Sequence, residues 1–330
     1  MRVSVIINPR AGAVKVDVLK DKISESLFRC ELSFHIVSHR KEVMAFILSE
    51  LEQKTNALMV CGGDGTVNET MQMVMSLKLG DKTPPLSIIS SGTANDLSHE
   101  LGISQRISEA ARSILSGEEK KIDIIEAESN GVKKYMLTNG GFGIPAITAD
   151  KANKLRSFLQ KRSQDSEEKS LIRHFSKYTH RFVKKMGSEV YSTFLIQSLL
   201  KWDSQDWNVE IEFEDGKRKI SKAPFLLINN QPYLGKKFLI APYTQNTDGM
   251  MNLTLIESHH LLTQLLSVLK VLRGSIRESS IVNISERSAF TVRSLSQKRQ
   301  LTFFGDGEIL FRDVQEIKFK CHHQQLTIMV

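Results

Sequence analysis

Short apolar runs alternate with amphipathic stretches of helix length through residues 1–125. The apolar runs predict strands at Val3–Ile7, Phe34–Val37, Ala57–Cys61 and Leu86–Ile89. Apolar positions at helical spacing predict helices near Val16–Phe28, Lys41–Gln53 and Val67–Leu77. This alternation is typical of a parallel sheet covered by helices, and such sheets bind ligands in the loops at the carboxyl ends of their strands.

The pattern changes in residues 126–330, where short β-like segments are separated by turn signals. The predicted strands are Tyr135–Asn139, Trp207–Phe213, Phe225–Asn229, Met251–Ile256, Leu301–Phe304 and Ile309–Phe311. Their alternation and the Asp-Gly turns predict an antiparallel sandwich. Two helical insertions interrupt it, the basic segment Ala149–Leu200 and the leucine-rich segment His260–Leu272. A chain of 330 residues is long enough for two domains, so we expect them at 1–125 and 126–330.

The composition is that of a globular protein, with 41% hydrophobic and 25% charged residues. The longest apolar runs, such as Ala223–Asn230, are too short or too interrupted to cross a bilayer. The N-terminus enters a predicted strand directly, without the pattern of an export signal, so we expect a cytoplasmic protein. Cys30, Cys61 and Cys321 are widely separated, which suits reduced thiols better than disulfides or a zinc site.

The net charge of +8 makes a polyanionic partner plausible: nucleic acid, an acidic membrane surface or phosphate ligands. Lys and Arg gather in 151–185, against only Asp165, Glu167 and Glu168. This basic segment could dock on anionic headgroups or form a solvated helical hairpin, and the sequence leaves both open. We expect no nucleic-acid partner, because the chain has no aromatic-rich basic platform or recognition-helix motif.

A glycine-rich loop, Cys61–Glu69, lies directly between a predicted strand and a predicted helix. Its glycines let the backbone approach a ligand, and the helix N-terminus offers N–H groups and a positive dipole end to phosphate. Asp64 could orient a magnesium ion through water. The loop lacks the P-loop lysine and does not fit the dinucleotide spacing. The alternative is a plain strand-to-helix turn with Asp64 as the helix cap.

Two further loops follow strands of the same predicted sheet, Ser90–Leu97 and Asn8–Gly12. The first carries small and hydroxyl residues that suit phosphate or ribose, although capping and turn formation explain it better when it is considered alone. In it, Asn95 and Asp96 could cap the next helix or hold the loop of Asp64. Three such loops at one sheet edge predict a nucleotide cleft.

Taken together, the motifs resemble the catalytic domain of bacterial diacylglycerol kinases and sphingosine kinases, in order and in spacing. The motifs are Asn8-Pro9-x-Ala11-Gly12, Gly62-Gly63-Asp64-Gly65-Thr66-x-Asn68-Glu69, Gly92-Thr93-x-Asn95-Asp96, Asn139-Gly140-Gly141-Phe142-Gly143, Asn229-Asn230, Ala241-Pro242 with Asp248-Gly249, and Asp306-Gly307-Glu308. The resemblance covers nearly the whole chain. The Gly-Gly-Asp-Gly-Thr core also links this family to NAD kinases and phosphofructokinases.

The resemblance implies an α/β protein with an N-terminal three-layer Rossmann-like nucleotide domain, of the NAD kinase and phosphofructokinase kind, and a C-terminal antiparallel β-sandwich. The last strand could return to the first domain. The implied activity is ATP-dependent transfer of a phosphoryl group to a lipid hydroxyl, with diacylglycerol giving phosphatidic acid. A sphingoid-base or other lipid kinase, a kinase of a soluble substrate such as NAD, and a nucleotide-binding protein without catalysis remain alternatives.

The resemblance also implies site residues. ATP would contact Asn8, Pro9, Arg10, Ala11, Gly12, Ser38, Gly62, Gly63, Asp64, Gly65, Thr66, Val67, Asn68, Glu69 and Thr93. Asp306 and Glu308, with Asp64, would be the catalytic acids, and one of the first two would be the general base. Without the family, Asp306–Glu308 is an ordinary hairpin turn.

A structural Mg²⁺ ion is implied at Asp248, with the carbonyl groups of Gln245 and Met250, and the alternative there is a plain turn. The implied partner is a lipid alcohol at the inner face of a membrane, reached by transient peripheral contact. A homodimer is a further possibility.

Overall fold

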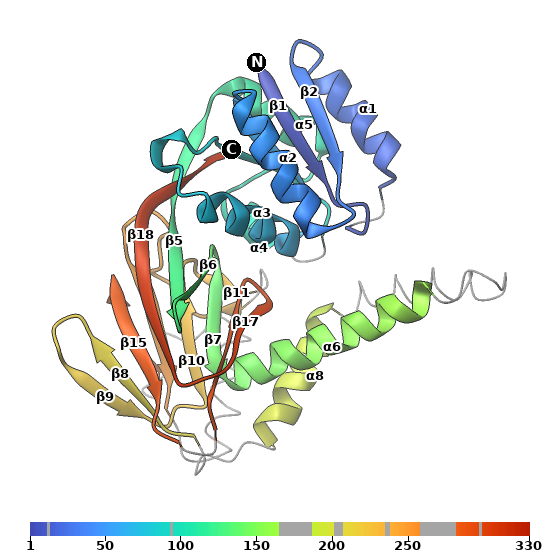
Figure 1. The fold of residues 1–330 in the computed structure, drawn as a ribbon. Helices are drawn as coiled ribbons and strands as arrows, with labels where there is room; N and C mark the ends of the chain where they lie inside the picture. Colours follow the sequence, from blue (N-terminus) through green and yellow to red (C-terminus); the bar gives the residue numbers. More distant parts are fainter. Residues whose placement is uncertain are drawn as a thin grey trace.

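The computed structural model describes residues 1–11, 14–92, 95–164, 187–200, 207–234, 238–257, 282–296 and 299–330 (Figure 1). The first part of the chain forms a parallel sheet in the order β2-β1-β3-β4. Its strands are β1 (Arg2–Ile7), β2 (Glu31–Ile36), β3 (Ala57–Gly62) and β4 (Leu86–Ser90). All six residues of β3 are buried, as expected for a central strand that is covered on both faces.

Helices cover both faces of this sheet. They are α1 (Val16–Ser26), α2 (Arg40–Glu52), α3 (Asp64–Ser76), α4 (Asp96–Glu100) and α5 (Ile107–Ser116), with a short 3₁₀ turn at Gly80–Lys82. On one face α1 packs against α5, and α5 packs against β4. On the other face α2 and α3 pack together over β1 and β3. The result is a three-layer Rossmann-like domain, which we call the nucleotide-type domain.

The second part of the chain forms two packed antiparallel layers. One layer is a sheet in the order β14-β13-β10-β7-β16-β17. Its strands are β14 (Val282–Arg287), β13 (Met251–Ile256), β10 (Phe225–Asn229), β7 (Asn139–Gly143), β16 (Leu301–Gly305) and β17 (Glu308–Val314). The other layer contains β5 (Glu119–Ser129), β6 (Val132–Met136), β8 (Val209–Phe213), β9 (Arg218–Ser221), β15 (Ala289–Ser294) and β18 (Glu316–Met329). A small ribbon joins β11 (Tyr233–Leu234) to β12 (Phe238–Leu239).

The last strand joins the two parts (Figure 1). Strand β18 pairs antiparallel with β15 and with β5 along most of its length. At its end it pairs in parallel with β4, with Ile328 opposite Leu86 and Met329 opposite Ser87. One sheet of ten strands therefore runs from the nucleotide-type domain into the sandwich.

Each part has its own apolar core. In the sandwich, four phenylalanines from both layers meet at ring-centroid distances of 5.0–5.8 Å: Phe142, Phe290, Phe303 and Phe319. In the first part, the buried side chains of β1, β3 and β4 pack against those of the covering helices. The predicted fold class, α/β with a C-terminal antiparallel β-sandwich, is confirmed.

A helical pair extends from the sandwich. Helix α6 (Ile144–Gln164) follows β7 directly, and α8 (Gly187–Leu200) packs beside it. These helices fall in the basic segment that the sequence singles out, of which 165–186 lies outside the described residues, as does the predicted helix His260–Leu272. Within the described residues, no helix is long and apolar enough to cross a membrane.

One predicted strand is divided in the structure. Tyr135–Asn139 becomes the end of β6 and the start of β7, with Leu137 and Thr138 between them. The backbone N–H groups of these two residues donate to the carboxylate of Asp306 instead of to a neighbouring strand.

Candidate functional site

The loops after β1, β3 and β4 meet at one edge of the sheet because these strands are in register. Ile7 lies opposite Cys61, and Gly62 lies opposite Ser90. Two backbone hydrogen bonds extend this register into the loops, from Asn8 N to Cys61 O at 3.0 Å and from Ser91 N to Gly62 O at 2.9 Å. The three glycine-, asparagine- and serine-containing loops of the sequence are thus brought together.

Glycine is required where these loops touch. A Cβ atom on Gly92 would lie 2.5 Å from the Cα atom of Gly63, and a Cβ atom on Gly62 would lie 2.5 Å from the Cβ atom of Thr66. Both distances are far inside van der Waals contact, and the Gly63 neighbour is backbone that cannot turn away. The close packing places the N-terminus of α3, with exposed Gly65, beside the β4 loop. The backbone N–H groups at the N-terminus of a helix are suited to binding an anion.

Asp64 fixes the geometry of the neighbouring loop. Its carboxylate accepts hydrogen bonds from Asn95 N at 2.7 Å and from Asp96 N at 2.9 Å. Asn95 has a left-handed backbone with φ of 52°, a conformation that asparagine tolerates better than most residues. The first acidic residue of α3 therefore caps the start of α4.

Asn8 connects the first loop to α3. Its side-chain N–H donates to Thr66 Oγ1 at 2.8 Å, while its Oδ1 accepts from Arg10 N at 3.0 Å. Ser38 follows β2, and its hydroxyl donates to the carboxylate of Glu42 on α2. That hydrogen bond holds the pKa of Glu42 below its usual value. Two predicted ATP contacts, Gly12 and Thr93, lie outside the described residues.

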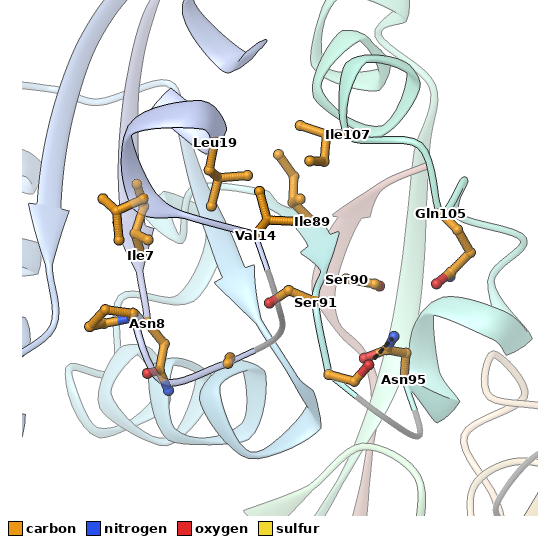
Figure 2. Close-up of a pocket in the computed structure, with 14 residues that line it drawn as sticks. Ile7, Asn8, Val14, Leu19, Ile89, Ser90, Ser91, Asn95, Gln105 and Ile107 are labelled. Carbon is orange, nitrogen blue, oxygen red and sulfur yellow. Dashed lines mark hydrogen bonds between the residues drawn. The ribbon is translucent and has the colours of Figure 1, made fainter. Parts of the chain in front are cut away.

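A pocket of about 230 Å³ opens at the same edge of the sheet (Figure 2). Its rim carries polar groups of Asn8, Ser91, Asn95 and Gln105. Its apolar lining comes from β1, β4, α1, α5 and the loop before α1, and consists of Ile7, Val14, Val16, Leu19, Ile89 and Ile107. An apolar recess therefore adjoins the backbone donors of the loops.

The acidic hairpin between β16 and β17 begins with Asp306, which is buried. Its carboxylate accepts hydrogen bonds from Leu137 N at 2.9 Å, Thr138 N at 2.8 Å, Thr138 Oγ1 at 2.7 Å and Asn68 Nδ2 at 2.5 Å. Burial raises the pKa of Asp306, and these donors act against the rise. A carboxylate surrounded by donors on both oxygens is an anchor for the hairpin rather than an open proton acceptor.

Glu308 lies on the other side of the same turn and is exposed. Its Oε1 lies 3.9 Å from the position of a Cβ atom on Gly65, at the N-terminus of α3. Its Oε2 lies 3.3 Å from the side-chain nitrogen of Asn153 on α6. The two acids, which the sequence alone could not tell apart, differ in burial and in surroundings.

The loop before β13 contains Gln245, Asp248 and Met250, close to one another in an exposed turn. The carboxylate of Asp248 accepts a hydrogen bond from Met250 N at 2.9 Å. The turn is tied to the sheet by Asp123, which is fully buried and accepts from Gly249 N at 2.7 Å. Among the described residues, no cluster of three or more histidine, cysteine or acidic side chains could hold a metal.

Sequence reasoning missed Asn153 and Asp123. Asn153 is an ordinary polar residue in a helix, and nothing in the sequence shows which hairpin it contacts. Asp123 did leave a signal, because it is a single acid in the apolar run Ile122–Ile125. A lone buried carboxylate of this kind needs partners, which here include the backbone N–H groups of Gly249 and Gln324.

Comparison with known families gives two matches. Residues 2–127 match the diacylglycerol kinase catalytic domain. Residues 174–330 match the YegS C-terminal NAD kinase beta sandwich-like domain. The two matched regions correspond to the nucleotide-type domain and to the sandwich.

Individual proteins are similar over different lengths. A diacylglycerol kinase from Bacillus subtilis (strain 168) is 24% identical over 339 residues, which cover 98% of this chain and 99% of that protein. A diacylglycerol kinase from Mycobacterium tuberculosis (strain ATCC 25618 / H37Rv) is 34% identical over 104 residues, 31% of this chain and 32% of that protein. The shorter match has the higher identity, and the longer one spans nearly the whole of both chains.

Solved structures share the fold. The crystal structure of a diacylglycerol kinase from Bacillus anthracis str. Sterne has a TM-score of 0.67 at 20% identity, covering 99% of this chain and 96% of that one. Another structure from the same organism has a TM-score of 0.72 at 21% identity, with the same coverage. At these identities the likeness establishes the arrangement of both domains and the connection between them.

Proposed function

Because this chain belongs to the diacylglycerol kinase-like lipid kinase family, we propose that it transfers the γ-phosphoryl group of ATP to the hydroxyl group of a membrane lipid. Diacylglycerol is the first candidate for the acceptor, and phosphatidic acid is then the product. The relatives that carry the name diacylglycerol kinase support this choice.

One observation carries the proposal: Glu308 of the sandwich approaches the N-terminus of α3, with Oε1 3.9 Å from the Cβ position of Gly65. Phosphoryl transfer needs an anion-binding loop and a proton acceptor on either side of the transferred group. The glycine-rich loops provide N–H donors and space, and the hairpin provides a carboxylate.

In the proposed reaction, the lipid hydroxyl oxygen forms a bond to the γ-phosphorus as the bond between that phosphorus and the β–γ bridging oxygen breaks. Glu308 accepts the hydroxyl proton, and ADP leaves with the bridging oxygen. A positioned general base of this kind contributes roughly 10²–10⁴-fold to the rate. Asp306 does not accept the proton in this scheme; it anchors the hairpin through Leu137, Thr138 and Asn68.

The residues fit ATP and Mg²⁺ as ligands. Gly65 at the start of α3 is exposed, and the backbone N–H groups of a helix N-terminus suit phosphate oxygens. Mg²⁺ bound with ATP would neutralise charge on the phosphates, and Asp64 is the carboxylate that would hold it through water. We keep the other predicted contacts, among them Pro9, Arg10, Ala11, Val67 and Glu69, as parts of this proposed site.

We also propose that the turn at Asp248 binds a second, structural cation. Its carboxylate is exposed, and the carbonyl groups of Gln245 and Met250 belong to the same turn. Oxygen ligands from one carboxylate and nearby backbone suit a hard cation such as Mg²⁺. Asp123 on β5 already holds Gly249 by a hydrogen bond. An ion at Asp248 would further restrict the movement of this turn relative to β5.

We further propose that α6 and α8 bring the enzyme to its substrate by peripheral contact with a membrane. Large apolar side chains are exposed on these helices, with 57% of Phe158, 43% of Ile196 and 59% of Leu200 accessible. Lys151 and Lys154 lie on the same helix pair and suit anionic headgroups.

Sedimentation with phosphatidylglycerol vesicles tests the membrane contact. Phe158→Ser and Leu200→Ser should each reduce the bound fraction, whereas Phe28→Ser, at an exposed phenylalanine beyond α1, should leave it unchanged. If the bound fraction falls equally in all three variants, or in none of them, the proposed membrane contact of α6 and α8 is rejected. Light scattering of the protein without vesicles would show whether it is a homodimer.

The activity is tested with purified protein, labelled ATP, Mg²⁺ and separate acceptors: diacylglycerol, a sphingoid base and NAD. Label in phosphatidic acid is the expected result. Label only in the sphingoid base changes the acceptor and keeps the class of lipid kinase. Label only in NAD, or ATP binding without transfer to any acceptor, rejects the proposal.

A further inference from the structure

Helix α6 holds the acidic hairpin from the side opposite Asp306. The side-chain nitrogen of Asn153 donates to Gly307 O at 2.9 Å and lies 3.3 Å from Glu308 Oε2. One turn earlier, Asp150 pairs with Arg312 on β17 at 2.5 Å and with Lys154 at 2.7 Å. Residues 150–154 of α6 therefore contact β17 at two points, one of them next to Glu308.

The orientation of the Asn153 amide follows from its surroundings. Turned by 180°, its oxygen would face a carbonyl and a carboxylate, which are both acceptors. In the observed orientation its nitrogen faces both acceptors, and a hydrogen bond to a carboxylate is stronger than one between neutral groups. The buried Oδ1 has no hydrogen-bond partner among the described residues. The orientation is therefore decided by the two acceptors of the hairpin.

The hairpin backbone needs such support. Asp306 and Gly307 both have left-handed backbone conformations, with φ of 51° and 80°. Asp306 is anchored through its own side chain, but Glu308 is exposed and its long side chain has several rotamers in water. Asn153 contacts the hairpin at two groups: the carbonyl group of Gly307, which precedes Glu308, and the carboxylate of Glu308 itself.

We propose that Asn153 is a positioning residue for Glu308: it directs Oε2 toward α6 and so leaves Oε1 toward the N-terminus of α3. The inference rests on the proposed function, because it assumes that Glu308 is the general base. Loss of this contact should reduce the fraction of molecules in which the base faces the acceptor hydroxyl. Nucleotide binding, which uses the loops of the other domain, should be unaffected.

Steady-state kinetics of three variants test this inference. Asn153→Ala should lower kcat roughly 10- to 100-fold, since small displacements of a catalytic group have effects of that size, with the KM for ATP unchanged. Asn153→Gln keeps an N–H donor and should recover part of kcat. Asn153→Asp places a second carboxylate beside Glu308 and should move the acidic limb of the pH profile of kcat/KM upward by about one pH unit. Ser157→Ala, an exposed change on the same helix, is the control.

Thermal unfolding of each variant shows whether the substitution destabilises the fold. The pH profile is the second readout, because a helix that merely fails to pack would not shift the pH profile of the remaining activity. Wild-type kcat and an unmoved acidic limb in both Asn153→Ala and Asn153→Asp would overturn the role of Asn153 while the lipid kinase proposal stands. Wild-type protein that phosphorylates no lipid would instead overturn the proposed function.

Discussion

Substitution of the two acids of the hairpin should have different effects on the stability of the fold. Asp306 is buried with four donors around its carboxylate, whereas Glu308 is exposed. Changing Asp306 to asparagine replaces one acceptor oxygen by an NH₂ group. Whichever oxygen is replaced, that group faces at least one buried N–H donor, at Leu137 and Asn68 on one side or at Thr138 on the other.

The magnitude follows from these contacts. A hydrogen bond to a charged group contributes about 1.5–3 kcal/mol, and a buried donor left without a partner costs about 1–3 kcal/mol. The release of a charge whose burial is unfavourable offsets part of this. We therefore expect Asp306→Asn to lower the free energy of unfolding by about 2–4 kcal/mol. Turnover should fall as well, because the anchored turn no longer holds Glu308 in place.

Glu308→Gln should lower turnover without lowering the stability of the fold. The amide has the same shape, its oxygen can still accept from Asn153, and an exposed substitution usually changes stability by less than about 0.5 kcal/mol. It cannot accept a proton from the lipid hydroxyl, so kcat should fall roughly 10²–10⁴-fold.

Urea unfolding followed by tryptophan fluorescence, together with initial rates of lipid phosphorylation, measures both effects on the same samples. The reasoning is refuted if Glu308→Gln turns over like the wild-type protein. It is equally refuted if Asp306→Asn unfolds at the wild-type urea concentration and abolishes activity, because Asp306 would then be the proton acceptor.

Three further predictions concern other parts of the chain. Burial acts to raise the pKa of Glu50, but hydrogen bonds from Arg2, Ser4 and Ser33 lower it below its usual value. This network should stabilise the fold at neutral pH and lose its effect as the pH falls below about 4, so Glu50→Gln should lower the melting temperature at pH 7 and flatten its decline in acid. Gly92→Ala should weaken ATP binding in calorimetry, because its Cβ atom meets Gly63, while Ser157→Ala on α6 should not. Asp248→Asn should abolish any rise in melting temperature caused by Mg²⁺ without nucleotide; an equal rise in both proteins would reject the structural cation.

The first domain could be predicted from sequence because its signals are local. Strand β3 is apolar in every position up to Gly62, so it had to be a central strand, and the glycines that follow it mark where the backbone turns. The positions of the loops after β1, β3 and β4 then follow from the parallel topology alone. The family resemblance added the identity of the acidic hairpin, more than 200 residues away in the sequence.

The sandwich was predicted in outline, and its contacts with the site were not. Strand β18 changes register between His322 and Leu326, where Gln324 has a left-handed backbone. Nothing in the sequence predicts that conformation. The division of roles between Asp306 and Glu308 depends on which one is buried, and that depends on the position of Leu137 and Thr138, 168 or 169 residues earlier. Contacts at such separations leave no periodic signal.

The hydrogen bond from Asn68 to Asp306 connects the two domains at the site itself. Asn68 lies one turn into α3, and the glycine-rich loop lies at the start of the same helix. A movement of the sandwich relative to α3 would therefore have to break this buried contact before it changed the distance between Glu308 and the loop. The amide of Asn68 also donates to Tyr135 O, and Gln72, one turn further along, exchanges two hydrogen bonds with the Tyr135 backbone. The helix that would bind phosphate, α3, is thus also the helix that is hydrogen-bonded to the acidic hairpin. In the proposed site, α3 therefore sets the distance between the proton acceptor and the phosphoryl group. The rotamer of Glu308 also enters this geometry, and Asn153 contacts its carboxylate.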